Sequence, residues 1–164
     1  MGTSFVTLGR GLDGAPAAQG SALGFWMHDS DLELLLRLMA LHVAVGGSPE
    51  SGDRAERVRD QWLMASGEGF VGSVPHGFEE LSVTPDELDI AREALRSLLV
   101  ALDQAPPTLP GAIFSLLGLG SPASWDLSVQ GIRRAVEAFD DLFAGRMKST
   151  SRDRAFVSIV QQGA

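Results

Sequence analysis

Residues 26–42 read WMHDSDLELLLRLMALH, and this stretch decides the predicted fold. We predict a helix over residues 30–45, with Glu33 and Arg37 one turn apart on a narrow polar stripe. Apolar side chains cover most of the remaining circumference. A helix that is apolar almost all round is typical of the centre of a bundle.

Further helices are predicted around this one. Apolar residues recur at helical spacing in four other segments, at residues 48–66, 85–104, 110–117 and 125–147. The clearest start is at Thr84, because Pro85 and Glu87 complete the pattern of a capping box. Two intrahelical ion pairs are also expected, Glu50 with Arg54 and Asp53 with Arg57.

At the two ends of the chain, apolar residues recur less clearly at helical spacing. We read residues 1–24 as a lead-in rich in strand and loop, 28–147 as the helical core and 148–164 as a tail. The apolar runs SFVTL near the start and AFVSIV near the end either pair as short strands or, in the case of the second, form a helical turn. The predicted fold class is therefore all-α: one domain, a bundle of four to five helices around a central apolar helix, with a short β pairing of the termini.

Charge is distributed unevenly along the 164 residues. The net charge is −8, and residues 28–104 carry 15 acidic and six basic residues, a net of −9. Such a segment disfavours binding to nucleic acid and to anionic membranes, since both require a cationic face. It favours a basic protein partner, although acidic charge also serves solubility alone.

The chain has no cysteine, and no stretch approaches the roughly 18 to 20 apolar residues of a membrane helix. The N-terminus lacks the pattern of a signal peptide. We therefore expect a soluble, cytoplasmic protein without disulfides.

His42 is the first candidate functional residue. Extrapolation of the predicted helix places it about 180° from the Glu33–Arg37 stripe, in the apolar arc. A neutral core histidine, bonded to a loop carbonyl or a carboxylate, is the favoured interpretation. The alternative is a metal ligand or proton carrier that lines a pocket.

The sequence HDSD places His28, Asp29 and Asp31 at the start of the same helix. Carboxylates are favoured there by the helix dipole, and Asp29 or Ser30 can cap the helix, so capping alone accounts for both aspartates. A His-Asp pair also belongs to the metal centre of HD-type phosphohydrolases. That pattern requires an earlier histidine, and none precedes His28.

The sequence HGFEE contributes His76, Glu79 and Glu80. A His-x-x-Glu pair can reach one metal ion from one helical face, whereas a solvated turn is the simpler interpretation. A metal site becomes credible only if His28, His42 and His76 converge in space with Asp29, Asp31 or Glu79.

Complete catalytic or cofactor motifs are absent from the sequence. Two segments match Gly-x-Gly-x-x-Gly, at residues 9–14 and 67–72, but neither has the strand before it and the helix after it that a dinucleotide site needs. We therefore predict no cofactor and no catalytic residue. Phe25, Trp26, Trp62 and Trp125 are read as lids on the core near helix ends, with binding hot spots as the alternative.

Two functions stay open at this point. The first is a small acidic protein-binding module that modulates a partner, of the immunity-protein, antitoxin or adaptor type. The second is a metal-dependent enzyme or metal-binding protein that uses His28, Asp29 and Asp31 with His42 or His76. The acidic middle segment and the absence of a catalytic motif favour the first.

Overall fold

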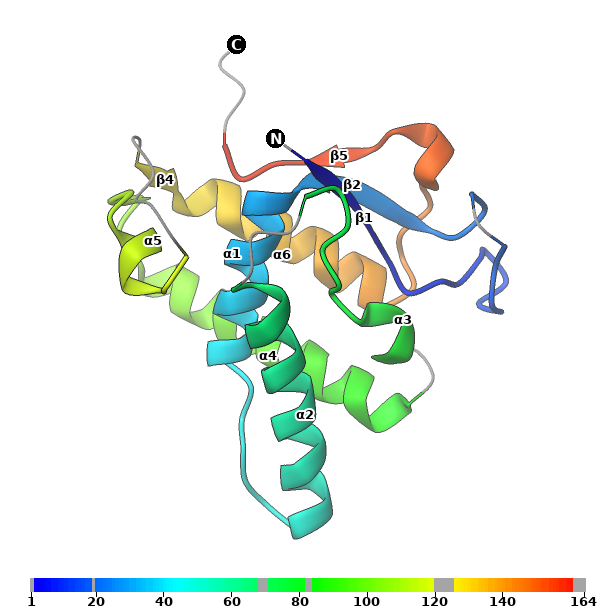
Figure 1. Ribbon diagram of the computed structural model, residues 1–164, viewed down its shortest axis with the longest axis horizontal. Coiled ribbons are helices and arrows are strands. Elements are labelled where there is room, and N and C mark those ends of the chain that lie inside the picture. The colour runs from blue at the N-terminus through cyan, green and yellow to red at the C-terminus, as the bar shows by residue number, and fades with distance from the viewer. Residues whose placement is uncertain (1, 19, 68–70, 82–83, 120–125, 161–164) are drawn as a thin grey trace.

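The protein has a mixed α/β fold in the computed structural model, which describes residues 2–18, 20–67, 71–81, 84–119 and 126–160 (Figure 1). In chain order the elements are β1 (Thr3–Thr7), β2 (Gly24–His28), α1 (Asp29–Leu41), α2 (Pro49–Ala65), α3 (Phe78–Leu81), α4 (Pro85–Gln104), β3 (Thr108–Leu109), α5 (Ile113–Leu116), β4 (Leu127–Ser128), α6 (Val129–Phe143), the 3₁₀ turn η1 (Ser151–Asp153) and β5 (Phe156–Val157). The all-α prediction is wrong, because three strands form a sheet against the helices.

The sheet has the order β1-β2-β5. Strand β2 pairs antiparallel with β1, with Phe5 opposite Trp26, and parallel with β5, with Trp26 opposite Phe156. The two terminal segments thus share a sheet, but they do not pair with each other because β2 lies between them. The sequence GFWMH was read as the approach to a helix, and its strand was missed for that reason.

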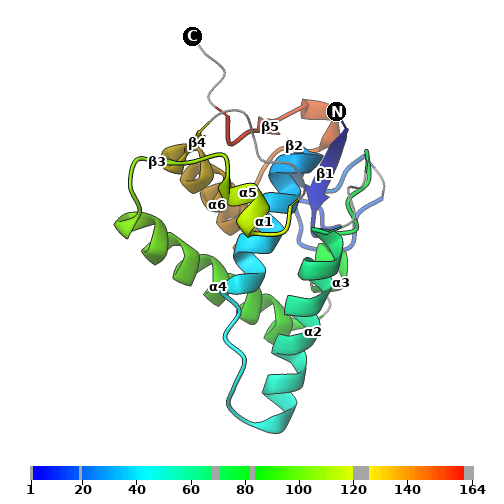
Figure 2. The ribbon, with the colours of Figure 1, turned by 60° about the vertical axis from the view of Figure 1, so that its left-hand side comes forward.

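Alternation along the strands gives the sheet a buried and an open face. Ser4, Val6, Phe25 and Met27 are buried, whereas Phe5 and Trp26 are half-buried and Phe156 is exposed. Helices cover the buried face: α1 contacts β1 and β2, and α6 contacts β5 (Figures 1 and 2). On this face the Phe25 and Phe139 rings meet edge to face. Period-2 alternation of this kind is expected of a sheet with one covered face.

Helix α1 runs from the sheet into the helical part of the molecule, where it contacts α2 and α4 (Figure 2). Four of its leucines are buried as expected: Leu32, Leu35 and Leu36 at 0% exposure and Leu34 at 1%. The helix ends at Leu41, however, and not at residue 45. Leu41 itself is 62% exposed, so the apolar arc does not extend to the last turn.

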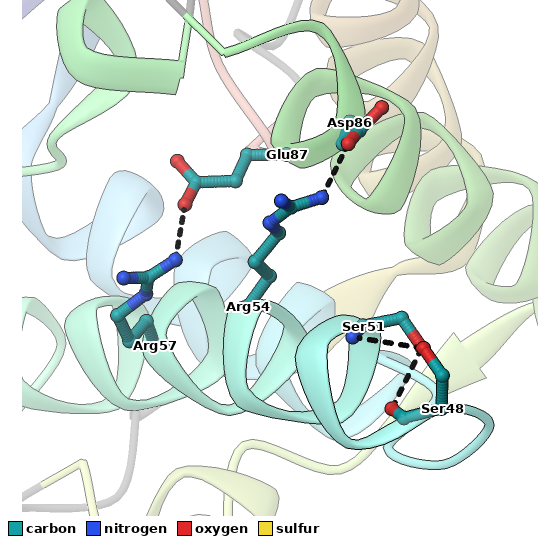
Figure 3. A network of polar contacts seen from close by, with 6 residues as sticks. All are labelled: Ser48, Ser51, Arg54, Arg57, Asp86 and Glu87. Atoms are coloured by element: carbon teal, nitrogen blue, oxygen red, sulfur yellow. Dashed lines mark hydrogen bonds and ion pairs between the residues drawn. The ribbon is translucent and has the colours of Figure 1, made fainter.

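Ion pairs join α2 to the start of α4 (Figure 3). Arg54 pairs with Asp86, and Arg57 Nη2 lies 3.2 Å from Glu87 Oε1. The prediction that these arginines pair with Glu50 and Asp53 within α2 is therefore wrong. Each guanidinium pairs instead with a carboxylate at the start of α4.

The predicted capping box at Thr84 does not form either. The Thr84 side chain makes no capping hydrogen bond. Its expected partner, Glu87, is engaged by Arg57 instead. Helix α2 begins with a true side-chain cap, in which Ser48 Oγ accepts from the Ser51 N–H at 3.4 Å (Figure 3).

The last long helix begins later than predicted and ends earlier. Residues Leu127–Ser128 form β4, which pairs antiparallel with β3, and α6 starts only at Val129. Ser128 caps this helix, since its Oγ accepts from the Gly131 N–H at 3.1 Å. Helix α5 spans four residues in place of the two turns predicted over residues 110–117.

No helix in the described ranges is long and apolar enough to cross a membrane.

Candidate functional site: a cleft on the open face of the sheet

A cleft of about 840 Å³ lies on the open face of the sheet. Phe5 and Trp26 are cross-strand neighbours that both line it, with their ring centroids 5.3 Å apart, and we call this pair its aromatic floor. Aromatic rings are large apolar groups, so the pair adds apolar surface to the lining of the cleft. The volume is within the range of roughly 300–1,000 Å³ that is usual for binding sites.

Trp26 is held in place by the segment that leads into β5. Its indole N–H donates to the Ser151 carbonyl oxygen at 3.1 Å, and its backbone N–H donates to the Ala155 carbonyl oxygen at 2.7 Å. The polar atom of the indole is therefore satisfied within the protein. Trp26 therefore lines the cleft without an unsatisfied indole N–H.

One wall of the cleft is formed by residues 72–77 and α3. Phe78 anchors this wall in the core, where its ring packs against those of Trp62, Phe139 and Phe143 at centroid distances of 6.1, 5.6 and 5.2 Å. Glu79 and Glu80 follow Phe78, are exposed, and line the cleft. The wall therefore adds two carboxylates to the aromatic floor.

His76 also lines the cleft, but both of its ring nitrogens are occupied. Nδ1 accepts from the Phe78 N–H at 3.1 Å, so it carries no proton. Nε2 must then hold the proton, and it lies 3.2 Å from the Phe5 carbonyl oxygen that accepts it. Burial lowers the pKa of His76, against an opposing effect of Glu79 and Glu80. His76 is thus a neutral structural histidine that ties the wall to β1.

Asp29 does not cap its helix. Its carboxylate accepts from Ser4 Oγ at 2.7 Å and from the Gly72 N–H at 2.6 Å. Ser4 Oγ in turn accepts from the Val74 N–H at 2.9 Å. The N-cap residue is His28, and α1 has no side-chain capping bond. The capping prediction is wrong, because Asp29 is used to join β1 and the cleft wall to α1.

Asp31 has a similar role on the other side of α1. Its Oδ2 accepts from the Ile159 N–H at 3.1 Å and lies 3.3 Å from Ser158 Oγ, so it fixes the segment that follows β5. Burial raises the pKa of Asp31, and the Ile159 hydrogen bond and the nearby His28 oppose that rise. The His28 ring packs edge to face against Phe156, with centroids 4.7 Å apart.

His42 is not the core histidine that was expected. It lies just past the end of α1 and is half-buried, with Nδ1 2.8 Å from Ser97 Oγ on α4. Its partner is a hydroxyl group, whereas the prediction was a carbonyl or a carboxylate. Helical extrapolation failed here because the helix stops one residue earlier. Partial burial lowers the pKa of His42.

The candidate metal ligands do not gather at one place. His76 and Glu79 line the cleft, whereas His42 is bonded to α4. His28 packs against Phe156, and Asp31 is bonded to the Ile159 N–H after β5. Within the described ranges, no group of three or more His, Asp and Glu side chains is arranged to hold a metal ion. The convergence that the metal hypothesis required is therefore not seen among them.

Phe5 was not identified from the sequence as a candidate functional residue, and Trp26 was placed in the wrong element. Trp26 was placed near a helix end, but it lies on the central strand. The alternation in TSFVT and GFWMH was the available signal. Phe25 and Trp62 are core residues with 1% exposure each, and Trp125 falls outside the described residues.

Comparison with family models, with curated proteins and with solved structures found no match.

Proposed function

We propose that this protein is a small acidic protein-binding module, of the immunity-protein, antitoxin or adaptor type, and that it holds a basic segment of its partner in the cleft. The observation that carries the proposal is the pairing of an aromatic floor, Phe5 and Trp26, with an acidic wall, Glu79 and Glu80.

The chemistry of the cleft matches that of an arginine or lysine side chain. The aliphatic stem of such a side chain packs well on aromatic rings, and its cationic head is attracted to a ring face within about 6 Å. A carboxylate on the adjacent wall then supplies a charge-assisted hydrogen bond. The net charge of −9 over residues 28–104 would also speed encounter with a basic partner.

The cleft supports binding better than it supports catalysis. His76 has no free lone pair for general-base work, since Nδ1 is occupied by a backbone N–H. Asp29 and Asp31 accept their hydrogen bonds from groups of the protein itself.

A charge-reversal pair of variants tests the proposal. Glu80→Arg changes an exposed carboxylate of the cleft wall, and Glu56→Arg makes the same change on exposed α2, away from the cleft. We expect wild type and Glu56→Arg to retain one basic partner in co-purification at low salt, and Glu80→Arg to lose it. The partner should also dissociate as ionic strength rises, because exposed charges are screened.

Equal retention by both variants would contradict the use of the cleft. Retention that is insensitive to salt, or a partner that is acidic, would contradict the electrostatic part of the proposal.

A further inference from the structure

A second groove, of about 490 Å³, lies apart from the cleft. Residues from the loop after β1, from α4 and from the end of α6 line it, and none of its lining residues lines the cleft. Its walls are mainly apolar, with side chains of Leu8, Leu12, Leu88, Leu142, Phe143 and Met147. Leu12 on this loop is 79% exposed, so a ligand in the groove could remove further apolar surface from water.

The charge of this groove is opposite to that of the chain. Among the residues that the structure describes, Arg10 and Lys148 are its two charged lining residues, and none of its lining residues is acidic. The chain as a whole has 21 acidic and 13 basic residues. The nearby Asp140 and Asp141 are both engaged by Arg146, at 2.6 and 2.8 Å. The groove thus presents two cationic side chains on a protein that is acidic as a whole.

From this combination we infer that the groove binds a small amphipathic anion, a carboxylate on an apolar chain. The apolar walls take the chain, and Arg10 and Lys148 take the carboxylate. A free carboxylate fits better than a membrane surface, because an anionic bilayer brings many like charges against a protein of net charge −8, whereas a free carboxylate brings one. The groove also has the dimensions of a small-molecule site.

Lys148 gives the inference a direct probe, since it is the only lysine of the chain. Its exposed ε-amine can be acetylated and followed by mass spectrometry, with the N-terminal α-amine as internal reference. We expect decanoate, kept below its micelle concentration, to slow acetylation of Lys148 relative to the α-amine and to raise the Tm. Decyltrimethylammonium, which has the same chain with a cationic head, should do neither.

Matched variants separate the groove from general charge effects. Lys148→Met should weaken decanoate binding by about two- to fivefold, the range for an exposed ion pair. Arg134→Met removes an exposed cation outside the groove and should leave the affinity unchanged. Leu12→Ser, at an exposed position, should also weaken binding without affecting the fold.

Three outcomes would overturn the inference. They are no protection of Lys148 by decanoate, an equal effect of decyltrimethylammonium, and protection by vesicles of anionic phospholipid but not by decanoate. None of them bears on the cleft, so this test and the partner test can fail independently.

Discussion

The carbonyl oxygen of Ile159 occupies the space that a Cβ atom on Gly131 would need. Gly131 lies in α6 and is buried, and Ile159 follows β5. A glycine inside a helix usually costs about 1 kcal/mol relative to alanine, so the sequence alone suggests a defect. The structure shows instead that the glycine lets the end of the chain pack directly on the helix.

Gly131→Ala should therefore destabilise the protein despite its better helix propensity. The added methyl group must displace the Ile159 backbone, and with it the hydrogen bond from the Ile159 N–H to Asp31. We expect a loss of about 1–3 kcal/mol in the free energy of unfolding, measured by urea denaturation.

Gly52 in α2 is the matched control. Nothing lies within 4 Å of the position of its Cβ atom. Gly52→Ala should therefore stabilise the protein by about 0.5–1 kcal/mol, the ordinary gain in helix propensity. If both substitutions stabilise, the close packing of Ile159 on α6 is wrong.

Asp29→Asn should destabilise the fold without changing its architecture. Both carboxylate oxygens accept hydrogen bonds, from Ser4 Oγ and from the Gly72 N–H, and an amide group would turn an N–H toward one of these donors. The expected loss is about 1–3 kcal/mol. Hydrogen exchange should show faster exchange of the Gly72 and Val74 amides, which belong to the same network.

A chelator distinguishes this role from a metal site. If Asp29 serves only hydrogen bonds, EDTA leaves the Tm of the wild-type protein unchanged. A fall in Tm on adding EDTA, reversed by a divalent metal in the wild type but absent from Asp29→Asn, would show that Asp29 is a metal ligand.

His76 should make the protein less stable as the pH falls. Burial lowers its pKa in the folded state, below the value of 6.5 that is ordinary for the unfolded chain. Between the two pKa values the unfolded state binds more protons, so the free energy of unfolding decreases as the pH is lowered through this window, by at most about 1.4 kcal/mol per pH unit. Below the folded pKa the decrease from His76 stops.

The difference between wild type and His76→Gln isolates this contribution. His42 and Asp31 also titrate, but their contributions are common to both proteins and cancel. We expect the wild type to lose more stability than the variant between about pH 7.5 and about pH 5.5. Parallel pH profiles, or an NMR assignment of the proton to Nδ1, would contradict the tautomer fixed by Phe5 and Phe78.

The helical core was largely predictable from the sequence. Residues 48–66 were expected to form a helix with apolar residues at helical spacing, and α2 buries four residues at that spacing, Ala55, Val58, Trp62 and Ala65. Periodicity succeeded here because one side of the helix faces the core and the other faces water.

The sheet was not predictable in the same way. Strand β2 runs directly into α1 without an intervening turn, since His28 ends the strand and Asp29 begins the helix. No glycine or proline marks the boundary, so the two-residue period of the strand runs without a break into the 3.6-residue period of the helix. Strand β5 is two residues long, too short for any alternation to show. The aromatic pair of the cleft depends on β2, because Trp26 lies on that strand and Phe5 lies opposite it on β1, so reading β2 as part of the helix also concealed the pair.

Polar contacts between segments distant in the sequence could not be predicted either. Thr84, Pro85 and Glu87 have the full pattern of a capping box, yet Glu87 pairs with Arg57 of α2. A local motif specifies which contacts are available, and the tertiary structure decides which of them form.

The difference between a capping motif in the sequence and a capping bond in the structure can be measured by comparing the starts of α6 and α4. Ser128 and Thr84 both occupy N-cap positions, but only Ser128 accepts a hydrogen bond from its helix, from the Gly131 N–H at 3.1 Å. Ser128→Ala should cost about 1 kcal/mol in the free energy of unfolding, the usual effect of removing a cap. Thr84→Ala should stay within about 0.5 kcal/mol of wild type, because no capping bond is lost. Urea denaturation of the two variants side by side measures both values. A cost at Thr84 equal to that at Ser128 would show that the capping box predicted from the sequence does form in solution, at the expense of the Arg57–Glu87 pair.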